Sequence, residues 1–318
     1  METNIQNPAR FEWERFLFGE GAQILDIRYD PVFKAVFTKD TEISKAALSD
    51  LISSLIGRAV TVDTITANEP PIDDMRQRRV RFDVACRTKN GEFINVEMSF
   101  NPDVDEPVRL EYYTGKLFTG QDMYGKDKEY NVLKETYQIA ILAKGNFFQD
   151  ENLIHEFLYY DPKTCVSLGG KTKIITVELV KTKPIVDKPI EDMTNAELWA
   201  VFFEYLTDKR KRAKIIEIIK REEGIAMAVT TLGSLTQNEA EFFRNLSLLK
   251  GELDYQSHMA HAKRTGLEEG RNEGLKEGRK EGRDETNIEN ARKMKTMGFL
   301  IEQIQAVTGL SAEIIAQL

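Results

Sequence analysis

Two segments rich in β-branched and aromatic residues, separated by Lys89-Asn90-Gly91, constrain the fold of this chain more than any other feature. The first segment is Val80–Thr88 and the second is Glu92–Phe100. An Asn-Gly pair between two such segments is a strong signal for a β-hairpin. Because side chains alternate between the two faces of a strand, the length of the hairpin loop decides whether Asp83 and Glu97 share a face.

The apolar neighbours of Asp83 and Glu97 predict that each carboxylate lies on the face opposite to the apolar side chains of its strand. A two-residue turn would place Asp83 opposite Met98. A three-residue loop, in which Gly91 suits the position at positive φ, would place Asp83 directly opposite Glu97. Opposed carboxylates can bind one divalent cation, and an all-oxygen site suits Mg²⁺ or Mn²⁺ acting on a phosphodiester. The alternative is that both carboxylates are simply exposed to solvent.

Helix and strand signals alternate through residues 26–183, which predicts a mixed α/β or α+β sheet domain. Helical spacing of apolar residues covers 32–37, 43–56 and 109–124, and Gly57 is a stop signal for the second of these helices. Strand signals outside the hairpin cover residues 59–68, 136–143, 153–160 and 173–180.

The chain divides into four regions by these patterns. They are an N-terminal arm (1–25), the sheet domain (26–183), a helical domain (190–263), and a charged repeat followed by a terminal helical pair (264–318). Pro184 and Pro189 mark the linker before the helical domain. Within that domain, Thr194–Glu197 and Thr236–Glu239 have the pattern of capping boxes, each of which begins a run of helical spacing.

The charged repeat has a glycine at every fourth position from Gly266 to Gly282, with glutamates at the same interval. A period of four drifts slowly around a helix of 3.6 residues per turn, so the glycines would form one narrow stripe. Close contact with another helix would explain that stripe, and a flexible linker is the alternative, because each glycine disfavours a helix. We expect a homo-oligomer that forms through this C-terminal helical region.

The composition restricts the class of protein. The 44 basic and 52 acidic residues give a net charge of −8, which argues against a general nucleic-acid binder but permits a local basic groove. No stretch approaches the roughly 20 apolar residues of a membrane span, and the N-terminus lacks the features of a signal peptide. Cys86 and Cys165 stand alone in strand-like runs, and we expect both to be buried in a reducing compartment. These features predict a cytoplasmic protein with no membrane partner.

Several short motifs follow one another in a fixed order. They are Tyr29-Asp30-Pro31-Val32-Phe33-Lys34-Ala35-Val36-Phe37, Arg81-Phe82-Asp83, Ile94-Asn95-Val96-Glu97-Met98, and Arg109-x-x-Tyr112-Tyr113 with Gln121, Gly125 and Tyr130. In these motifs the chain resembles the Rpn family of recombination-promoting nucleases and transposase-related proteins, within the PD-(D/E)XK nuclease superfamily. The resemblance covers residues 27–179 and extends loosely to the glycine–glutamate repeat.

This resemblance implies both a fold and an activity. The fold is a restriction-endonuclease-like PD-(D/E)XK core, whose central mixed sheet carries metal-binding carboxylates, followed by an α-helical C-terminal region. The activity is Mg²⁺-dependent endonucleolytic cleavage of DNA, related to transposases and promoting recombination. Asp83 and Glu97 match the metal-binding residues of the family, and Asp30 matches the acidic residue of its first helix motif.

The sequence departs from the family at one position. Ser99, two residues after Glu97, stands where the family usually has Gln and the wider superfamily has Lys. Serine has neither a cationic head nor the reach of an amide. The resemblance therefore predicts that the orienting role passes to Gln121 or Lys116 on the following helix, or that the activity is reduced.

Basic residues close to Asp83 are candidates for contacts with DNA phosphates. The alternative for the densest cluster is a strand edge that charge keeps from aggregating. The candidates are Arg76, Arg78, Arg79, Arg81, Lys34 and Arg109. The favoured hypothesis is a metal-dependent DNA endonuclease. The alternatives are a DNA-binding or regulatory protein with an impaired nuclease centre, and an oligomerising interaction protein.

Overall fold

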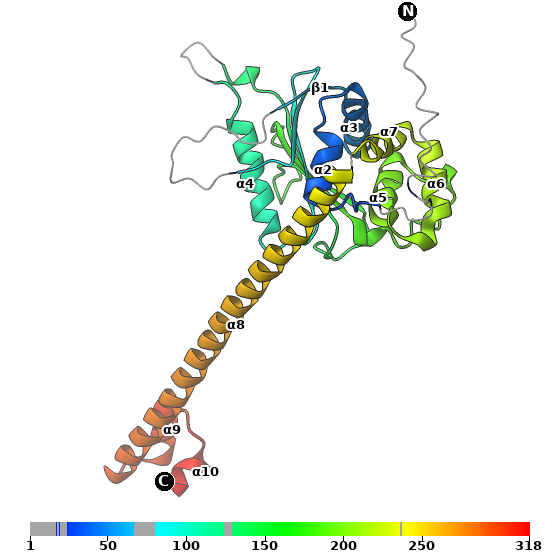
Figure 1. Ribbon diagram of the computed structural model, residues 1–318. Coiled ribbons are helices and arrows are strands. Elements are labelled where there is room, and N and C mark those ends of the chain that lie inside the picture. The colour runs from blue at the N-terminus through cyan, green and yellow to red at the C-terminus, as the bar shows by residue number, and fades with distance from the viewer. Residues whose placement is uncertain (1–16, 18, 20–23, 67–79, 124–128, 236) are drawn as a thin grey trace, which may run out of the picture. The chain divides into compact units, whose positions relative to one another are not determined.

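The computed structural model describes residues 17, 19, 24–66, 80–123, 129–235 and 237–318 (Figure 1). The chain separates into two compact units, residues 1–251 and residues 252–318. The predicted N-terminal arm lies mostly outside the described residues. The described helices that lie wholly within the first unit are α2 (Asp30–Phe37), α3 (Glu42–Ile56), α4 (Glu106–Thr119), α5 (Asn195–Tyr205), α6 (Arg212–Arg221) and α7 (Glu223–Gly233). The described residues of this unit also include the 3₁₀ helices η1 (Tyr130–Val132), η2 (Leu179–Thr182), η3 (Ile190–Asp192) and η4 (Lys209–Lys211).

The described strands form one mixed sheet in the order β1-β2-β3-β4-β6-β5. Their bounds are β1 (Val62–Ile65), β2 (Val84–Thr88), β3 (Phe93–Ser99), β4 (Thr136–Leu142), β5 (Ile154–Phe157) and β6 (Thr172–Glu178). β3, β4 and β6 run parallel, and the other neighbouring pairs are antiparallel. Every residue of β4 is buried, as expected for a central strand covered on both faces. The predicted fold class, a mixed sheet followed by helices, is confirmed.

Helices cover both faces of the sheet (Figure 1). On one face, alternate β4 residues such as Ile139 join α2, α3 and α5 to α7 in one hydrophobic core, which includes Phe33 and Trp199. On the other face, Ala140 and Leu142 pack against Leu110 of α4. The predicted linker at residues 184–189 therefore connects two parts of a single hydrophobic core.

Local sequence signals set several helix ends. α3 ends at Gly57, whose φ of +77° suits glycine, as predicted. The capping box of Thr194 and Glu197 is present at the start of α5, whereas the second predicted box begins at Thr236, outside the described residues. The helix predicted from residue 109 instead begins at Glu106, with a proline in its first turn, and ends before Gly120.

The expectation for the cysteines is correct for one of the two. Cys86 is buried in β2, and burial raises the pKa of its thiol to about 12. Cys165 is exposed in the loop between β5 and β6, with a φ of +55°. The strand predicted over residues 153–160 ends at Phe157, so this loop begins earlier than the sequence indicates.

The second unit consists of the larger part of α8 (Gln237–Thr296) together with α9 (Ile301–Thr308) and α10 (Ala312–Gln317). The charged repeat is helical throughout, and the five glycines from Gly266 to Gly282 all face open space in this structure. Ala291, Ile304 and Ile315 form a small core among the three helices, and Ser311 is the N-cap of α10, as predicted. None of the described helices has the length and apolar character needed to cross a bilayer.

Candidate active site

The register of the hairpin determines the geometry of the site. β2 and β3 pair with Val84 opposite Val96, which places Asp83, the residue before β2, opposite Glu97. The loop contains three residues and ends at Gly91, whose φ is +84°. The register predicted for a three-residue loop is thus confirmed, and the two-residue turn is excluded.

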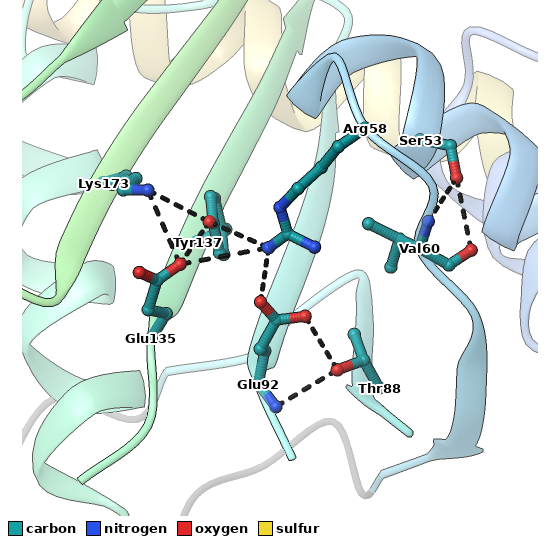
Figure 2. Close-up of polar contacts among 8 residues, drawn as sticks. All are labelled: Ser53, Arg58, Val60, Thr88, Glu92, Glu135, Tyr137 and Lys173. Carbon is teal, nitrogen blue, oxygen red and sulfur yellow. Dashed lines mark hydrogen bonds and ion pairs between the residues drawn. The ribbon is translucent and has the colours of Figure 1, made fainter. Parts of the chain in front are cut away.

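A polar network holds this hairpin at its loop end (Figure 2). The hydroxyl of Thr88 donates to Oε2 of Glu92 at 2.9 Å, and the backbone N–H of Glu92 donates back to that hydroxyl at 3.1 Å. Arg58 forms an ion pair with Glu92 and donates to the hydroxyl of Tyr137 at 3.1 Å. Lys173 of β6 donates to the same hydroxyl at 3.1 Å. These contacts link the hairpin to β4 and β6.

Asp83 is buried, with 7 % of its surface exposed. Its Oδ2 accepts a hydrogen bond from the backbone N–H of Met98 at 3.0 Å, and its Oδ1 lies 2.9 Å from Nζ of Lys34. Its own backbone N–H donates to Oε1 of Glu97 at 3.2 Å. The Asp83 carboxylate is therefore fixed between β3 and α2.

Glu97 is also buried, with 3 % of its surface exposed. Its Oε1 accepts a hydrogen bond from Nδ2 of Asn95 at 2.8 Å, and its Oε2 lies 3.9 Å from Nη1 of Arg109. Arg109 is held in turn by Glu106, with 2.6 Å between Nη2 and Oε1. β3 and α4 thus fix the second carboxylate.

Burial raises the pKa of both carboxyl groups. For Asp83, desolvation is the largest cause, and the negative charges of Glu97 and Asp30 raise the pKa further, against the opposing charge of Lys34. For Glu97, desolvation raises the pKa, while the hydrogen bond from Asn95 lowers it. Burial and mutual repulsion disfavour the charged forms of these two carboxyl groups. A cation bound between them would stabilise the charged forms.

The residues of this site fit a hard divalent cation. The two opposed carboxylates supply oxygen donors, and the nearby Oδ1 of Asn95 is buried without a hydrogen-bond partner. In the part of the chain that the structure describes, no group of three His, Cys, Asp or Glu side chains is placed to hold a metal. Asp83 and Glu97 are candidate metal ligands because their oxygens oppose one another, and water and substrate oxygens would complete the shell.

Asp30 and Lys34 also lie at the site. Lys34 contacts acidic side chains there, whereas the sequence suggests a contact with DNA phosphate. Nζ of Lys34 lies 2.8 Å from Oδ1 of Asp30 and 2.9 Å from Oδ1 of Asp83. Burial opposes protonation, but the charges of Asp83 and Asp30 outweigh it and raise the pKa of Lys34, so the amine stays protonated. Lys34, predicted as a phosphate contact, is engaged with the carboxylates.

Gln121 is not brought to the carboxylates. Its side chain donates to the carbonyl oxygen of Lys134 and to the hydroxyl of Thr136, and accepts from the backbone N–H of Lys134. Thr136 begins β4 and pairs with Phe93 at the start of β3, at the opposite end of that strand from Glu97. The prediction that Gln121 replaces the missing side chain at position 99 is therefore not supported. Gln121 instead connects the segment after α4 to β4.

The remaining predicted residues lie at different distances from the site. Ser99 is the last residue of β3 and is half-buried, on the face of the strand that Glu97 occupies. Lys116 lies over the ring of Tyr112, 5.9 Å from its centroid. Arg81 is exposed two residues before Asp83. The other arginines of the predicted cluster, Arg76, Arg78 and Arg79, lie outside the described residues.

Polar residues that the sequence motifs leave without a role support the two carboxylates. Nδ2 of Asn95 donates to Glu97 and also to Oε1 of Gln138 at 3.0 Å. Asn95 precedes Glu97 by two residues, so its place on the same face of the strand is evident from the alternation. Gln138 is a lone amide in an apolar segment, which is a weaker signal. Glu106, which holds Arg109, carries no signal of its own.

A mixed sheet with two opposed, buried carboxylates, one immediately before β2 and one on β3, is consistent with a PD-(D/E)XK fold. The family model for PD-(D/E)XK nuclease family transposases matches residues 27–262, and the chain belongs to this family. The family implies a nuclease that hydrolyses phosphodiester bonds, with DNA as its substrate. Comparison of the chain with curated proteins and with solved structures found no match.

The raised pKa of Glu97 makes the stability of the metal-free protein depend on pH. Because the folded state keeps this proton to higher pH than the unfolded chain does, the free energy of unfolding falls as pH rises above the unfolded pKa. We expect Glu97→Gln to stabilise the metal-free protein more at pH 8 than at pH 5, measured by urea unfolding in EDTA. Glu42→Gln, whose side chain is 95 % exposed, should have the same small effect at both pH values. An equal effect of Glu97→Gln at both would contradict the prediction.

Proposed function

We propose that this protein is a metal-dependent DNA endonuclease related to transposases, which promotes recombination by hydrolysing phosphodiester bonds. The pair of buried, opposed carboxylates of Asp83 and Glu97, in a chain of the PD-(D/E)XK nuclease family transposases, carries this proposal. Asp83 and Glu97 would hold Mg²⁺ or Mn²⁺. When bound, this ion would activate water and stabilise negative charge on the phosphodiester.

The neighbouring residues preorganise these ligands. The backbone N–H of Met98 holds Oδ2 of Asp83, and the amide of Asn95 holds Oε1 of Glu97. One carboxylate oxygen of each residue also lies close to a basic side chain: Oδ1 of Asp83 to Lys34, and Oε2 of Glu97 to Arg109. Such fixed orientation reduces the reorganisation that metal and substrate binding would otherwise require.

We assign to Lys34 the positive charge that the chain lacks at position 99. The hydroxyl of Ser99 is neutral, whereas the ammonium of Lys34 lies 2.9 Å from Oδ1 of Asp83. A cation at that position can stabilise the negative charge that develops on the phosphate during hydrolysis. Asp30 is then a positioning residue, because it holds Lys34 at 2.8 Å.

Basic side chains near the carboxylates would contact the DNA backbone. Arg109 is partly exposed and adjoins Glu97, and Arg81 is exposed close to Asp83. We extend this proposed phosphate-binding role to Arg76, Arg78 and Arg79 because they immediately precede Arg81 in the chain. Contacts of this kind position a duplex without reading its sequence.

Neutral variants of the two carboxylates test the proposed activity. We expect the wild-type protein to nick supercoiled plasmid in Mg²⁺ or Mn²⁺ but not in EDTA. Asp83→Asn and Glu97→Gln should each lower the rate on the order of 100-fold or more, because each removes a negative metal ligand. Gel analysis of plasmid topology gives the rate, and the exposed Glu42→Gln serves as the matched control.

The outcomes of that assay separate the hypotheses. Equal nicking by wild type and both carboxylate variants would rule out the proposed centre. Binding of DNA without nicking by any of the proteins would favour the alternative, a DNA-binding or regulatory protein with an impaired nuclease centre.

The role of Lys34 is tested by moving its charge. Lys34→Met should lower the nicking rate roughly 10- to 100-fold, because the developing charge loses a nearby cation. Adding Ser99→Lys to Lys34→Met should restore part of that rate, whereas adding Ser99→Met should not. Calorimetric titration with Mn²⁺ should show that all three proteins still bind the metal. A Lys34→Met protein that cleaves at the wild-type rate would exclude the assignment.

Oligomerisation through the C-terminal helical region remains a proposal. It is supported by the uninterrupted helix over the glycine repeat, because a helix with bare glycines at its surface can approach another helix closely. We expect the full-length protein to show a mass above the 36.4 kDa of one chain by light scattering. A chain that ends at Lys263 should be monomeric. If the truncated chain forms the same oligomer as the full-length protein, the repeat is not needed for oligomerisation.

A further inference from the structure

A cavity of about 240 Å³ lies on the face of the sheet that carries Glu97 and is not used by the proposed chemistry. Its walls come from α4, β4, β6, the end of β5 and the loop after β4. Most of the lining side chains are apolar or aromatic, among them Leu110, Leu142, Phe147, Phe148, Phe157 and Ile174. The cavity is smaller than the roughly 300–1,000 Å³ typical of sites for drug-sized ligands, so it suits a single ring system.

The cavity and the carboxylates share one face of the sheet. Glu97 pairs with Ala140 of β4, and Ala140 pairs with Thr176 of β6, which lines the cavity. Neighbouring strands lie about 4.8 Å apart, so the backbones at Glu97 and Thr176 are separated by roughly 10 Å. Glu106 joins the two places directly, because it lines the cavity and also holds Arg109 beside Glu97.

Thr176 lines this apolar cavity and carries a polar group that is buried beneath its surface. The residue is 2 % exposed, and its Oγ1 has no hydrogen-bond partner. A buried hydroxyl without a partner is unfavourable, and most buried polar groups in proteins are paired. Rotation of the Thr176 side chain toward the cavity would let this hydroxyl pair with the polar edge of a ligand whose faces contact apolar side chains.

Aromatic side chains form one wall of the cavity and its opening. The ring of Phe148 lies 5.1 Å from that of Phe157 and 4.5 Å from that of His155, measured between centroids. Phe157 is 41 % exposed and Tyr159 is 52 % exposed, so the wall reaches solvent. The loop that carries Phe147 is anchored, because its backbone N–H donates to Oε1 of Glu178 at 2.6 Å. This wall is an ordered surface on which a flat ring can stack.

We propose that the cavity binds one unpaired nucleobase of the DNA strand that is cleaved at Asp83 and Glu97. This inference rests on the proposed nuclease function and specifies its substrate, which must expose a base outside the duplex stack. A nucleobase has the required flat, apolar faces and polar edge. The carboxylates of Glu106 and Glu111 also line the cavity, which disfavours entry of a phosphate. The backbones at Glu97 and Thr176 are roughly 10 Å apart, so a base in the cavity would belong to a nucleotide close to the cleaved bond.

The experiment compares two single-stranded oligonucleotides with the same backbone, one intact and one with abasic sites throughout. Fluorescence anisotropy measures their binding to the full-length protein, with Ca²⁺ replacing Mg²⁺ to separate binding from cleavage. We expect wild type to prefer the intact strand by about 5- to 150-fold, the range for stacking of one base on aromatic side chains.

Two substitutions change the cavity without touching the carboxylates. Ile174→Phe fills it and should bring the preference for the intact strand close to one. Thr176→Val removes only the unpartnered hydroxyl and should reduce the preference by about 2- to 10-fold, the effect of one hydrogen bond. Because this change also removes an unsatisfied buried group, the variant should melt no lower than wild type. The control is Thr64→Val on the exposed surface of β1, at the opposite edge of the sheet.

The possible results test the nucleobase site and the proposed nuclease function separately. Equal binding of intact and abasic strands by wild type, a preference that survives Ile174→Phe, or no binding at all would overturn the nucleobase site. A preserved preference in a protein that never nicks plasmid would overturn the proposed nuclease function and leave the base-binding cavity in place.

Discussion

The antiparallel pairing of β2 with β3 is the constraint on which the site depends. A slip of one residue would turn Glu97 toward the hydrophobic core and bring Val96 to the face that Asp83 occupies. The register is fixed at the far end of the hairpin, by the positive φ of Gly91 and by the contacts of Glu92 with Thr88 and Arg58. Five residues, or roughly 16 Å of extended strand, separate Glu92 from Glu97. A polar network remote from the carboxylates thus sets their geometry.

The electrostatics of the site follow one pattern on both sides. Each buried carboxylate lies near a basic residue on a helix, and that residue is paired with an acid one turn earlier in the same helix. The two sets are Asp83, Lys34 and Asp30 on the side of α2, and Glu97, Arg109 and Glu106 on the side of α4. Burying charged groups is costly unless they are paired and hydrogen-bonded. The fold therefore keeps two carboxyl groups in its interior, and their raised pKa values indicate that this compensation is incomplete.

The sequence predicts the fold class from motif order, and it limits the hairpin to two registers because the loop near Gly91 contains either two or three residues. The observed pairing of β2 with β3 selects the three-residue loop, and the alternation of side chains then places Asp83 opposite Glu97. The position of Lys34 is not predictable in the same way, because it follows from how α2 packs on β3. The role predicted for Gln121 is not supported, for a related reason. It follows α4 closely in the chain, yet the parallel connection to β4 takes it to the opposite end of the sheet. The cavity is also beyond sequence analysis, because its walls come from segments far apart in the chain.

The glycine repeat has a consequence for how this protein can vary in length. Because α8 is regular through the repeat and each unit has four residues, one unit contributes about 6 Å of helix and about 40° of rotation beyond whole turns. Losing or duplicating a unit would preserve the glycine stripe. It would change the length of α8 and the direction in which the end of α8, α9 and α10 point around the helix axis. A change of one repeat unit would therefore alter the geometry of the helix in a fixed step, without requiring a new helix to be built.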